Sequence, residues 1–249
     1  MPCCLFAFSL IMLGLSQTFA RSLPGKDLVP SETATATPSP TPDNFIKDLV
    51  HDQKKIFASP LHLERQDLKW IIPFAVATGF LLKSDRETSS WVSPKGTLAS
   101  VSEKVSWGGE VFVTSGFAAG LFALGRSRND SHLAKTGKLA FEALVGTSLV
   151  IGITKNVAER TRPNGDNGLG HFFQEGKSFP SGHSSDAWAV ATVIAYEYRR
   201  RPVVKYGAVA AAIAISLSRY SCRAHFMSEV LVGSAIGYGV ARFVYVSHN

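Results

Sequence analysis

The stretch PSGHSSDAWAVATVIAYEY, residues 180–198, joins a polar tetrapeptide to an apolar segment long enough for a helix. Residues 187–196 of this stretch carry no charge. An apolar run without strict alternation, at this length, favours a helix over a strand. Five more apolar segments lie beyond residue 60, and alternating β-branched runs are few among them. The six predicted helices are 68–83, 108–125, 138–155, 183–198, 203–218 and 225–245.

These segments predict an all-α fold, a bundle of about six short helices. Glycines at 233, 237 and 239 would let helices approach closely, as they do in bundles inside and outside membranes. We also expect an amphipathic helix from residue 45, with Phe45, Ile46 and Leu49 on one face. It either packs on its own domain, which is the commoner case, or lies on a lipid surface.

The N-terminal region divides into two parts by composition. Residues 1–20 are interpreted as a secretory signal peptide, because an apolar run ends in Thr18-Phe19-Ala20. No Lys or Arg precedes this run, so a retained membrane anchor is the alternative. Residues 21–44 are rich in Pro, Ser and Thr and predict a disordered tether. The folded domain is therefore expected over residues 45–249, exported to the periplasm or cell envelope.

The predicted helices are short for membrane spans. A span needs about 20 mostly apolar residues, and none of the six reaches this length without a charge. If the N-terminus were exported and all six helices crossed, Arg199-Arg200-Arg201 would lie outside, against the positive-inside rule. We therefore expect a bundle that is soluble or rests on a membrane, with an integral membrane protein as the alternative.

The charge balance restricts the class of partner. The 249 residues carry a formal net charge of +7, which favours anionic partners such as phosphates or acidic lipids. The basic residues are not interleaved with aromatic ones as in a nucleic-acid-binding stripe, and zinc-ligand spacing is missing from the sequence. The charge by itself selects none of these anionic partners, and we expect no nucleic acid. A membrane surface and a homodimer are further partners that the sequence allows.

The first motif is Lys155 with Arg162-Pro163. Seven residues are two helical turns, so if the helix continues beyond Lys155, both cations project from one face until Pro163 ends it. Two such cations suit one phosphate group. Taken alone, the same spacing is typical of a solvated helix face.

The second motif is Pro180-Ser181-Gly182-His183, which precedes a predicted helix. The N–H groups of a first helical turn form an anion site. Gly182 permits close approach of the backbone, Ser181 adds a hydroxyl donor, and His183 has an imidazole suited to proton donation. In isolation, the tetrapeptide is more typical of a serine N-cap followed by a surface histidine.

The third motif is Ser218-Arg219 with His225, and Glu229 follows four residues later. On a helix, His225 and Glu229 would share one face within hydrogen-bonding reach. A carboxylate on one ring nitrogen leaves the other free for nucleophilic attack. The alternatives are a plain surface pair and a metal pair that lacks its third ligand.

Together the three motifs, over about residues 68–245, resemble the phosphatidic acid phosphatase type 2 / vanadium haloperoxidase superfamily. One position departs from that family, whose third motif has Asp where this chain has Glu229. The resemblance implies that His225 attacks phosphorus, that Glu229 orients it and that His183 protonates the leaving group. It also implies a set of phosphate-binding groups. These are Lys155, Arg162, Ser181, Gly182 and Arg219.

The resemblance further implies a metal-independent phosphatase without a cofactor, acting through a phosphohistidine. Its substrate would be a phosphorylated small molecule or lipid, either a phosphomonoester or an isoprenoid diphosphate. Vanadate is expected to inhibit by bonding to His225, as a mimic of the transition state. Two alternatives remain. One is a vanadate-dependent haloperoxidase, although those chains are much longer, and the other is a non-catalytic phosphate-binding relative, suggested by Glu229.

Overall fold

The computed structural model describes residues 53, 68–93 and 95–249, all within the compact unit Leu49–Asn249. Over 68–93 and 95–249 the chain forms seven α-helices, one 3₁₀ turn and no strand, so the predicted all-α class is confirmed. The helices are α3 (Leu68–Ser90), α4 (Thr97–Ser106), α5 (Val111–Ser127), α6 (Ser131–Ala158), α7 (Gly182–Glu197), α8 (Pro202–Ser221) and α9 (Met227–Ser247), with η3 (Trp107–Gly109) after α4.

Each of the six predicted segments corresponds to a helix, but their number and lengths differ from the prediction. Helix α4 was not predicted, because its Ser, Glu and Lys residues gave no apolar run. Helix α6 has 28 residues and α3 has 23, since both continue through charged positions. The predicted signal peptide, tether and amphipathic helix lie outside the described residues, except that residue 53 is helical.

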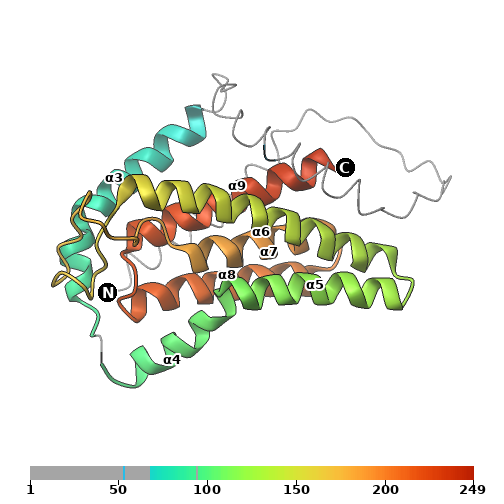
Figure 1. Cartoon of the computed structure of the whole chain (residues 1–249), viewed down its shortest axis with the longest axis horizontal. Helices are drawn as coiled ribbons and strands as arrows, with labels where there is room; N and C mark the ends of the chain where they lie inside the picture. Colours follow the sequence, from blue (N-terminus) through green and yellow to red (C-terminus); the bar gives the residue numbers. More distant parts are fainter. Residues whose placement is uncertain (1–52, 54–67, 94) are drawn as a thin grey trace. The chain divides into compact units, whose positions relative to one another are not determined.

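Helix α7 is the central element of the bundle. It packs against α6, α8 and α9, while α5 packs against α6 (Figure 1). The buried core lies between α5, α6, α7 and α9. It consists of Ala118, Leu139, Ala140, Ala143, Leu144, Ala189, Val190, Val193, Ala241 and Val244. Small side chains dominate this core, so the helix axes lie close together.

Two glycines set the contact between α7 and α9. A Cβ on Gly233 would lie 2.3 Å from the Ser181 carbonyl oxygen, and one on Gly237 would lie 2.0 Å from that of Ser185. Neither distance is compatible with a side chain. The predicted close approach is therefore confirmed at Gly233 and Gly237, but Gly239 has no neighbouring atom within 4 Å of such a Cβ. This contact fixes the first turn of α7 against α9.

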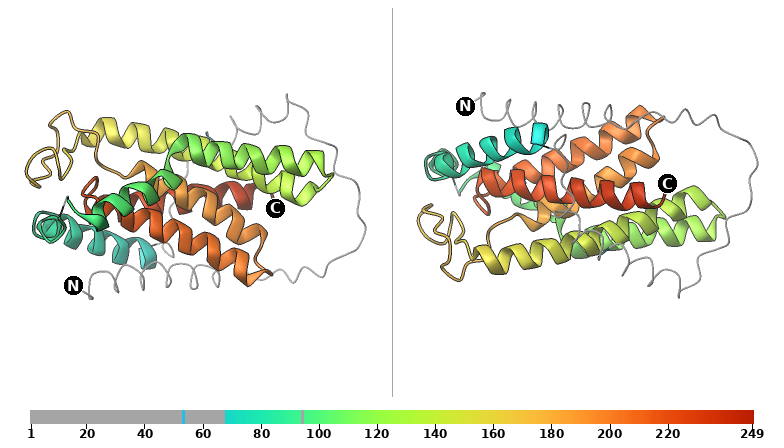
Figure 2. Two further views of the ribbon diagram at one scale, coloured as in Figure 1. Left: turned by 90° about the horizontal axis from the view of Figure 1, so that it is seen from below. Right: turned by 90° about the horizontal axis from the view of Figure 1, so that it is seen from above.

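The functional motifs gather at one end of the bundle. The long connection between α6 and α7 and the short turn between α8 and α9 lie at the same end, and both views of Figure 2 agree on this placement. Helix α4 packs against α8. The three motifs predicted from sequence all lie at or beside these connections.

The helix lengths and the exposed apolar side chains correct the expectation that no helix is long enough to cross a membrane. Helices α6 and α9 are long and apolar enough to do so. Large apolar side chains are also exposed, including Phe80 at 67%, Phe112 at 83% and Val203 at 85%. In α6 the charge of Glu142 is buried and paired with Lys138 at 3.5 Å, so it does not end the apolar segment. These features support association with a membrane.

Candidate active site

The first motif is not helical throughout, so the condition for placing Lys155 and Arg162 on one helix face is not met. Helix α6 ends at Ala158, because Glu159 adopts left-handed backbone angles (φ 43°, ψ 39°) and its N–H donates to the Lys155 carbonyl. Arg162 therefore belongs to the connection between α6 and α7 rather than to the helix face of Lys155. The Lys155 ammonium donates to the Lys177 carbonyl at 2.9 Å, which ties the end of α6 to the same connection.

The cations of the first and third motifs nevertheless converge. Lys155, Arg162 and Arg219 each act electrostatically on both His183 and His225. Arg219 is 9% exposed, and its Nη1 donates to Ser106 Oγ at 2.8 Å. Within the described part of the chain, the buried Nε of Arg219 has no hydrogen-bond acceptor. A buried guanidinium with an unused donor is suited to an anion's oxygen.

The second motif begins α7. Ser181 is its N-cap and accepts from the N–H and hydroxyl of Ser184 at 3.5 and 3.0 Å. The N-cap interpretation is thus correct, and the Ser181 hydroxyl proton remains available for an anion. Gly182 has open space where a side chain would be, since a Cβ there would meet only Ile151, at 4.0 Å. His183 is partly buried in the first turn, so it is not a surface histidine.

His225 and Glu229 form the predicted pair, but not on one helix. Helix α9 begins at Met227, so His225 precedes it in the turn after α8. The two side chains still meet, with His225 Nδ1 2.7 Å from Glu229 Oε2. The Phe226 N–H also donates to that oxygen, at 3.2 Å. Glu229 reaches backward over the start of its own helix, and the extra methylene of Glu provides this reach. His225 Nε2 is left for another partner.

Ser178 strengthens this pair and was not predicted. Its hydroxyl donates to Glu229 Oε2 at 2.5 Å and lies 3.4 Å from His225 Nδ1. All three residues are buried. Two donors and the imidazole therefore surround one carboxylate oxygen, which fixes the ring orientation of His225.

A buried ion network holds the other oxygen of Glu229, and sequence analysis missed it as well. Arg160 Nη1 lies 3.4 Å from Glu229 Oε1, and Arg160 Nη2 lies 2.9 Å from Asp85 Oδ2. Arg160 Nη1 also donates to Ser228 Oγ at 3.0 Å, and the Ser228 N–H donates to Asp85 Oδ1 at 3.1 Å. The network connects α3, the α6–α7 connection and α9.

Aromatic rings enclose the central guanidinium of this network. Arg160 Cζ lies 4.2 Å from the centroid of Phe226 and 4.8 Å from that of Phe172. Its Nε donates to the Gly170 carbonyl at 3.0 Å. Stacking and charge pairing together exclude water from Arg160, which is 2% exposed. The only signal in the sequence was its position between Lys155 and Arg162.

The environment keeps both imidazoles neutral in the free protein. Burial, with the positive charges of Arg219, Lys155 and Arg162, holds the pKa of His225 well below its usual value. Burial and the same cations, together with His225, lower the pKa of His183 to about 3. A neutral His225 is able to act as a nucleophile. A bound phosphate would offset the cations and favour a proton on His183.

Lys155, Arg162 and Arg219 thus lie close enough to both imidazoles to act on their charge, and Glu229 contacts His225 directly. His183 and Arg219 line one cavity of about 370 Å³. Such an arrangement combines oxyanion stabilisation with a fixed nucleophile and a second imidazole for proton transfer.

Comparison with known proteins agrees with this geometry. The family description of the PAP2 superfamily matches residues 137–249. A solved structure, the crystal structure of the first transmembrane PAP2 type phosphatidylglycerolphosphate phosphatase from Bacillus subtilis, shares the fold with a TM-score of 0.53. The two chains are 23% identical, and the match covers 82% of this chain and 95% of that one. A search of curated proteins found no match. The match over residues 137–249 thus agrees with the family resemblance that the three motifs predicted.

Proposed function

We propose that this chain is a phosphatase that hydrolyses a phosphomonoester or diphosphate of a lipid through a covalent phosphohistidine at His225, without a metal. The observation that carries the proposal is the buried contact of 2.7 Å between His225 Nδ1 and Glu229 Oε2, beside a cluster of three cations. Membrane association favours a lipid substrate over a freely soluble one.

The reaction proceeds in two displacements. His225 Nε2 attacks phosphorus, the bond from phosphorus to the leaving oxygen breaks, and His183 gives that oxygen a proton. Water then attacks the phosphohistidine and loses a proton to His183, and the N–P bond breaks to release phosphate. Lys155, Arg162 and Arg219 neutralise the phosphoryl oxygens in both steps.

The position of Glu229 favours turnover over simple phosphate binding. The concern from sequence was that one extra methylene would misplace the carboxylate. In the fold, the longer side chain meets His225, Ser178 and Arg160 together. A binding module would have no need for an imidazole held in this way.

Phosphate release tests the proposal directly. The full chain, purified in detergent, should release phosphate from an alkyl phosphate, a diacylglycerol phosphate or an isoprenyl diphosphate in the presence of a metal chelator. Vanadate should inhibit it. Absence of release from all three across pH 4 to 9 would reject a phosphatase, and activity lost with the chelator would reject the metal-independent mechanism.

Shortening Glu229 is expected to impair this site. Glu229→Asp would draw the carboxylate back from His225, because the residue is fixed at the start of α9. An orientation error of this kind costs roughly a hundredfold in rate. We expect kcat/KM to fall by about that factor with little change in KM, as measured by phosphate release. An increase in turnover would show that Glu229 is a weakened substitute for Asp.

The activity should be greatest in acid. Because the pKa of His183 is lowered to about 3 and that of His225 is also lowered, neither ring is an imidazolium at neutral pH. The proton that His183 passes to the leaving oxygen therefore arrives on the substrate, whose monoester phosphate has a pKa of about 6. Since this proton is lost as pH rises, kcat/KM should be about 100-fold lower at pH 8 than at pH 5. A rate that rises from pH 5 to pH 8 would contradict this assignment.

A further inference from the structure

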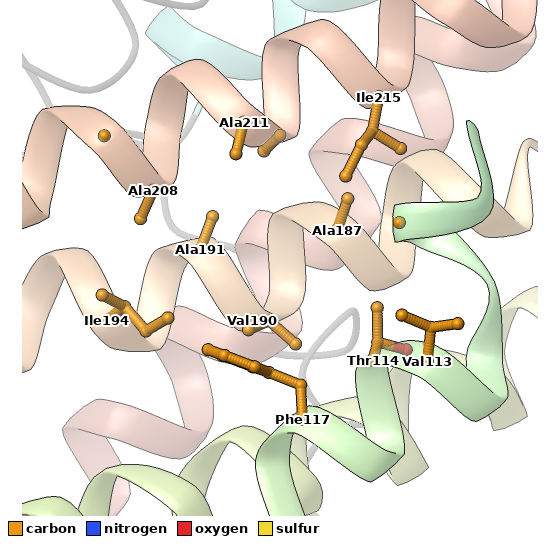
Figure 3. Close-up of a pocket in the computed structure, with 13 residues that line it drawn as sticks. Val113, Thr114, Phe117, Ala187, Val190, Ala191, Ile194, Ala208, Ala211 and Ile215 are labelled. Carbon is orange, nitrogen blue, oxygen red and sulfur yellow. The ribbon is translucent and has the colours of Figure 1, made fainter. Parts of the chain in front are cut away.

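An apolar groove adjoins the phosphate site. It has a volume of about 340 Å³ and lies between α5, α7 and α8 (Figure 3). A neighbouring cavity of about 370 Å³ is lined by the site residues His183 and Arg219, with Glu110 and Trp107 among its other walls. Val113 lines both cavities, so the groove begins where the phosphate site ends.

Helix α7 carries one wall from the polar cavity into the groove. His183 is in its first turn, and Ala187, Ala191 and Ile194 follow at spacings of four, eight and eleven residues. These positions share one helix face. The last three side chains line the groove and are labelled in Figure 3. The wall therefore changes from an imidazole to purely apolar groups within one turn.

Helix α8 repeats this pattern in the opposite chain direction. Arg219 lines the polar cavity, and Ile215, Ala211 and Ala208 line the groove at successive turns. The small side chains of Ala208 and Ala211 leave the space open (Figure 3). From Arg219 to Ala208 the helix rises by about 16 Å, so the polar cavity and the groove together form a path of about this length.

Helix α5 closes the groove with Val113, Thr114 and Phe117. The Thr114 hydroxyl lies 3.1 Å from the Glu110 carbonyl and 3.2 Å from that of Val111, so its proton is already bound to the backbone. The groove thus offers an occupant dispersion contacts and apolar burial, and hardly any hydrogen bonding. Such a lining fits a hydrocarbon and disfavours a sugar or a peptide.

We propose that this groove holds one hydrocarbon chain of the substrate, and that the enzyme thereby prefers single-chain lipid phosphates to two-chain ones. The inference rests on the proposed function. Carbon atoms pack about 4 Å apart, so a volume of about 340 Å³ spread over the roughly 12 Å from Ile215 to Gly207 accommodates one extended chain and not two. An extended chain advances about 1.2 Å per bond, so the path accommodates about a dozen carbons.

A series of monoalkyl phosphates from butyl to tetradecyl, each kept below its micelle concentration, tests the proposal. For each added methylene, kcat/KM should rise about fourfold, up to about twelve carbons, and then level off. For a dialkyl lipid phosphate with the same chains, kcat/KM should be no higher than for the single-chain compound. An unchanged kcat/KM over the whole series, with butyl phosphate still hydrolysed, would overturn the groove assignment.

Two neighbouring alanines supply a matched pair of variants. Ala211→Phe would fill the groove, whereas Ala210→Phe places the same ring on an exposed position that does not line it. Ala211→Phe should lower kcat/KM for decyl phosphate at least about 30-fold and leave butyl phosphate within about twofold. Ala210→Phe should leave both unchanged. An equal decrease of kcat/KM in the two variants, or for both substrates in Ala211→Phe, would contradict a chain-binding groove.

Binding of alkyl phosphonates separates this inference from the proposed function. These compounds are not hydrolysed, and their affinity for the wild-type protein and for Ala211→Phe is measurable by calorimetry in lipid nanodiscs. One outcome would support chain binding in the groove but reject the phosphatase. In that outcome, affinity rises with chain length and is lost in Ala211→Phe, yet no ester releases phosphate. Affinity independent of chain length would reject the groove, whatever the activity.

Discussion

Replacing His225 by Asn is expected to lower kcat by about 10⁵-fold or more, the largest effect of any single change in this chain. The expectation follows from the role of His225 as the atom that bonds to phosphorus, because loss of a nucleophile removes the whole covalent path. Asn is close in size to part of the ring, so the buried contact with Glu229 is not replaced by a large cavity. The measurement is phosphate release at substrate saturation.

The pair His132 and Glu197 provides the control. Their side chains meet at 2.9 Å, much as His225 and Glu229 do, but they join the start of α6 to the end of α7. His132→Asn should therefore retain full kcat. If His225→Asn kept more than about a hundredth of the wild-type rate while folded, attack by this imidazole would be excluded.

Replacing Arg160 by Met is expected to destabilise the fold by about 3–5 kcal/mol, because it leaves two buried carboxylates without their shared cation. Asp85 is 1% exposed and Glu229 0%, so neither gains water when the guanidinium is removed. For a chain of this size the loss corresponds to a decrease of roughly 10 °C in Tm. Thermal unfolding in detergent measures it.

Arg162, two residues further along, is the matched control. It is exposed, and the proposed mechanism uses it only for phosphate. Arg162→Met should therefore leave Tm within about 1 °C while lowering kcat/KM by about 100-fold, the usual cost of one transition-state donor. The main effect of Arg160→Met should instead be a decrease in Tm. If both variants behaved alike in both measurements, the separation of a structural from a phosphate-binding arginine would be wrong.

Much of the site was predictable because its chemistry lies in short local motifs. Lys155, His183 and His225 each stand in a recognisable spacing, and their convergence was expected from the family resemblance. Their backbone context was less predictable. The left-handed conformation at Glu159 ends α6 before Arg162, and α9 begins two residues after His225. Helical spacing alone gave the right partners with the wrong local geometry.

The residues that hold the site in place were not predictable in the same way. Asp85 and Ser228 are 143 positions apart, and Ser178 and Glu229 are 51 apart. Contacts of this kind depend on how helices pack, so no local pattern indicates them. Arg160 resembles any charged residue in a polar connection until the fold buries it between Phe172 and Phe226.

The lengths of the helices show a further limit of sequence reasoning. Counting uncharged residues predicted short helices, because Glu142 and similar charges seemed to end each apolar run. In the fold, Glu142 is buried and paired with Lys138, and α6 continues through both. Apolar side chains of α3, α5 and α8 are exposed, and their hydropathy does not distinguish them from core residues. Hydropathy indicates that a residue avoids water, without indicating whether protein or lipid covers it.

Chemical trapping of the phosphoenzyme tests the central claim most directly. The full chain is mixed with substrate labelled with ³²P, quenched in alkali within milliseconds, and digested for mass spectrometry. The mechanism predicts a single phosphoryl group that is stable in alkali and labile in acid, located on His225 and missing from His225→Asn. Label on another residue, or full turnover with no covalent phosphate at any time, would contradict it.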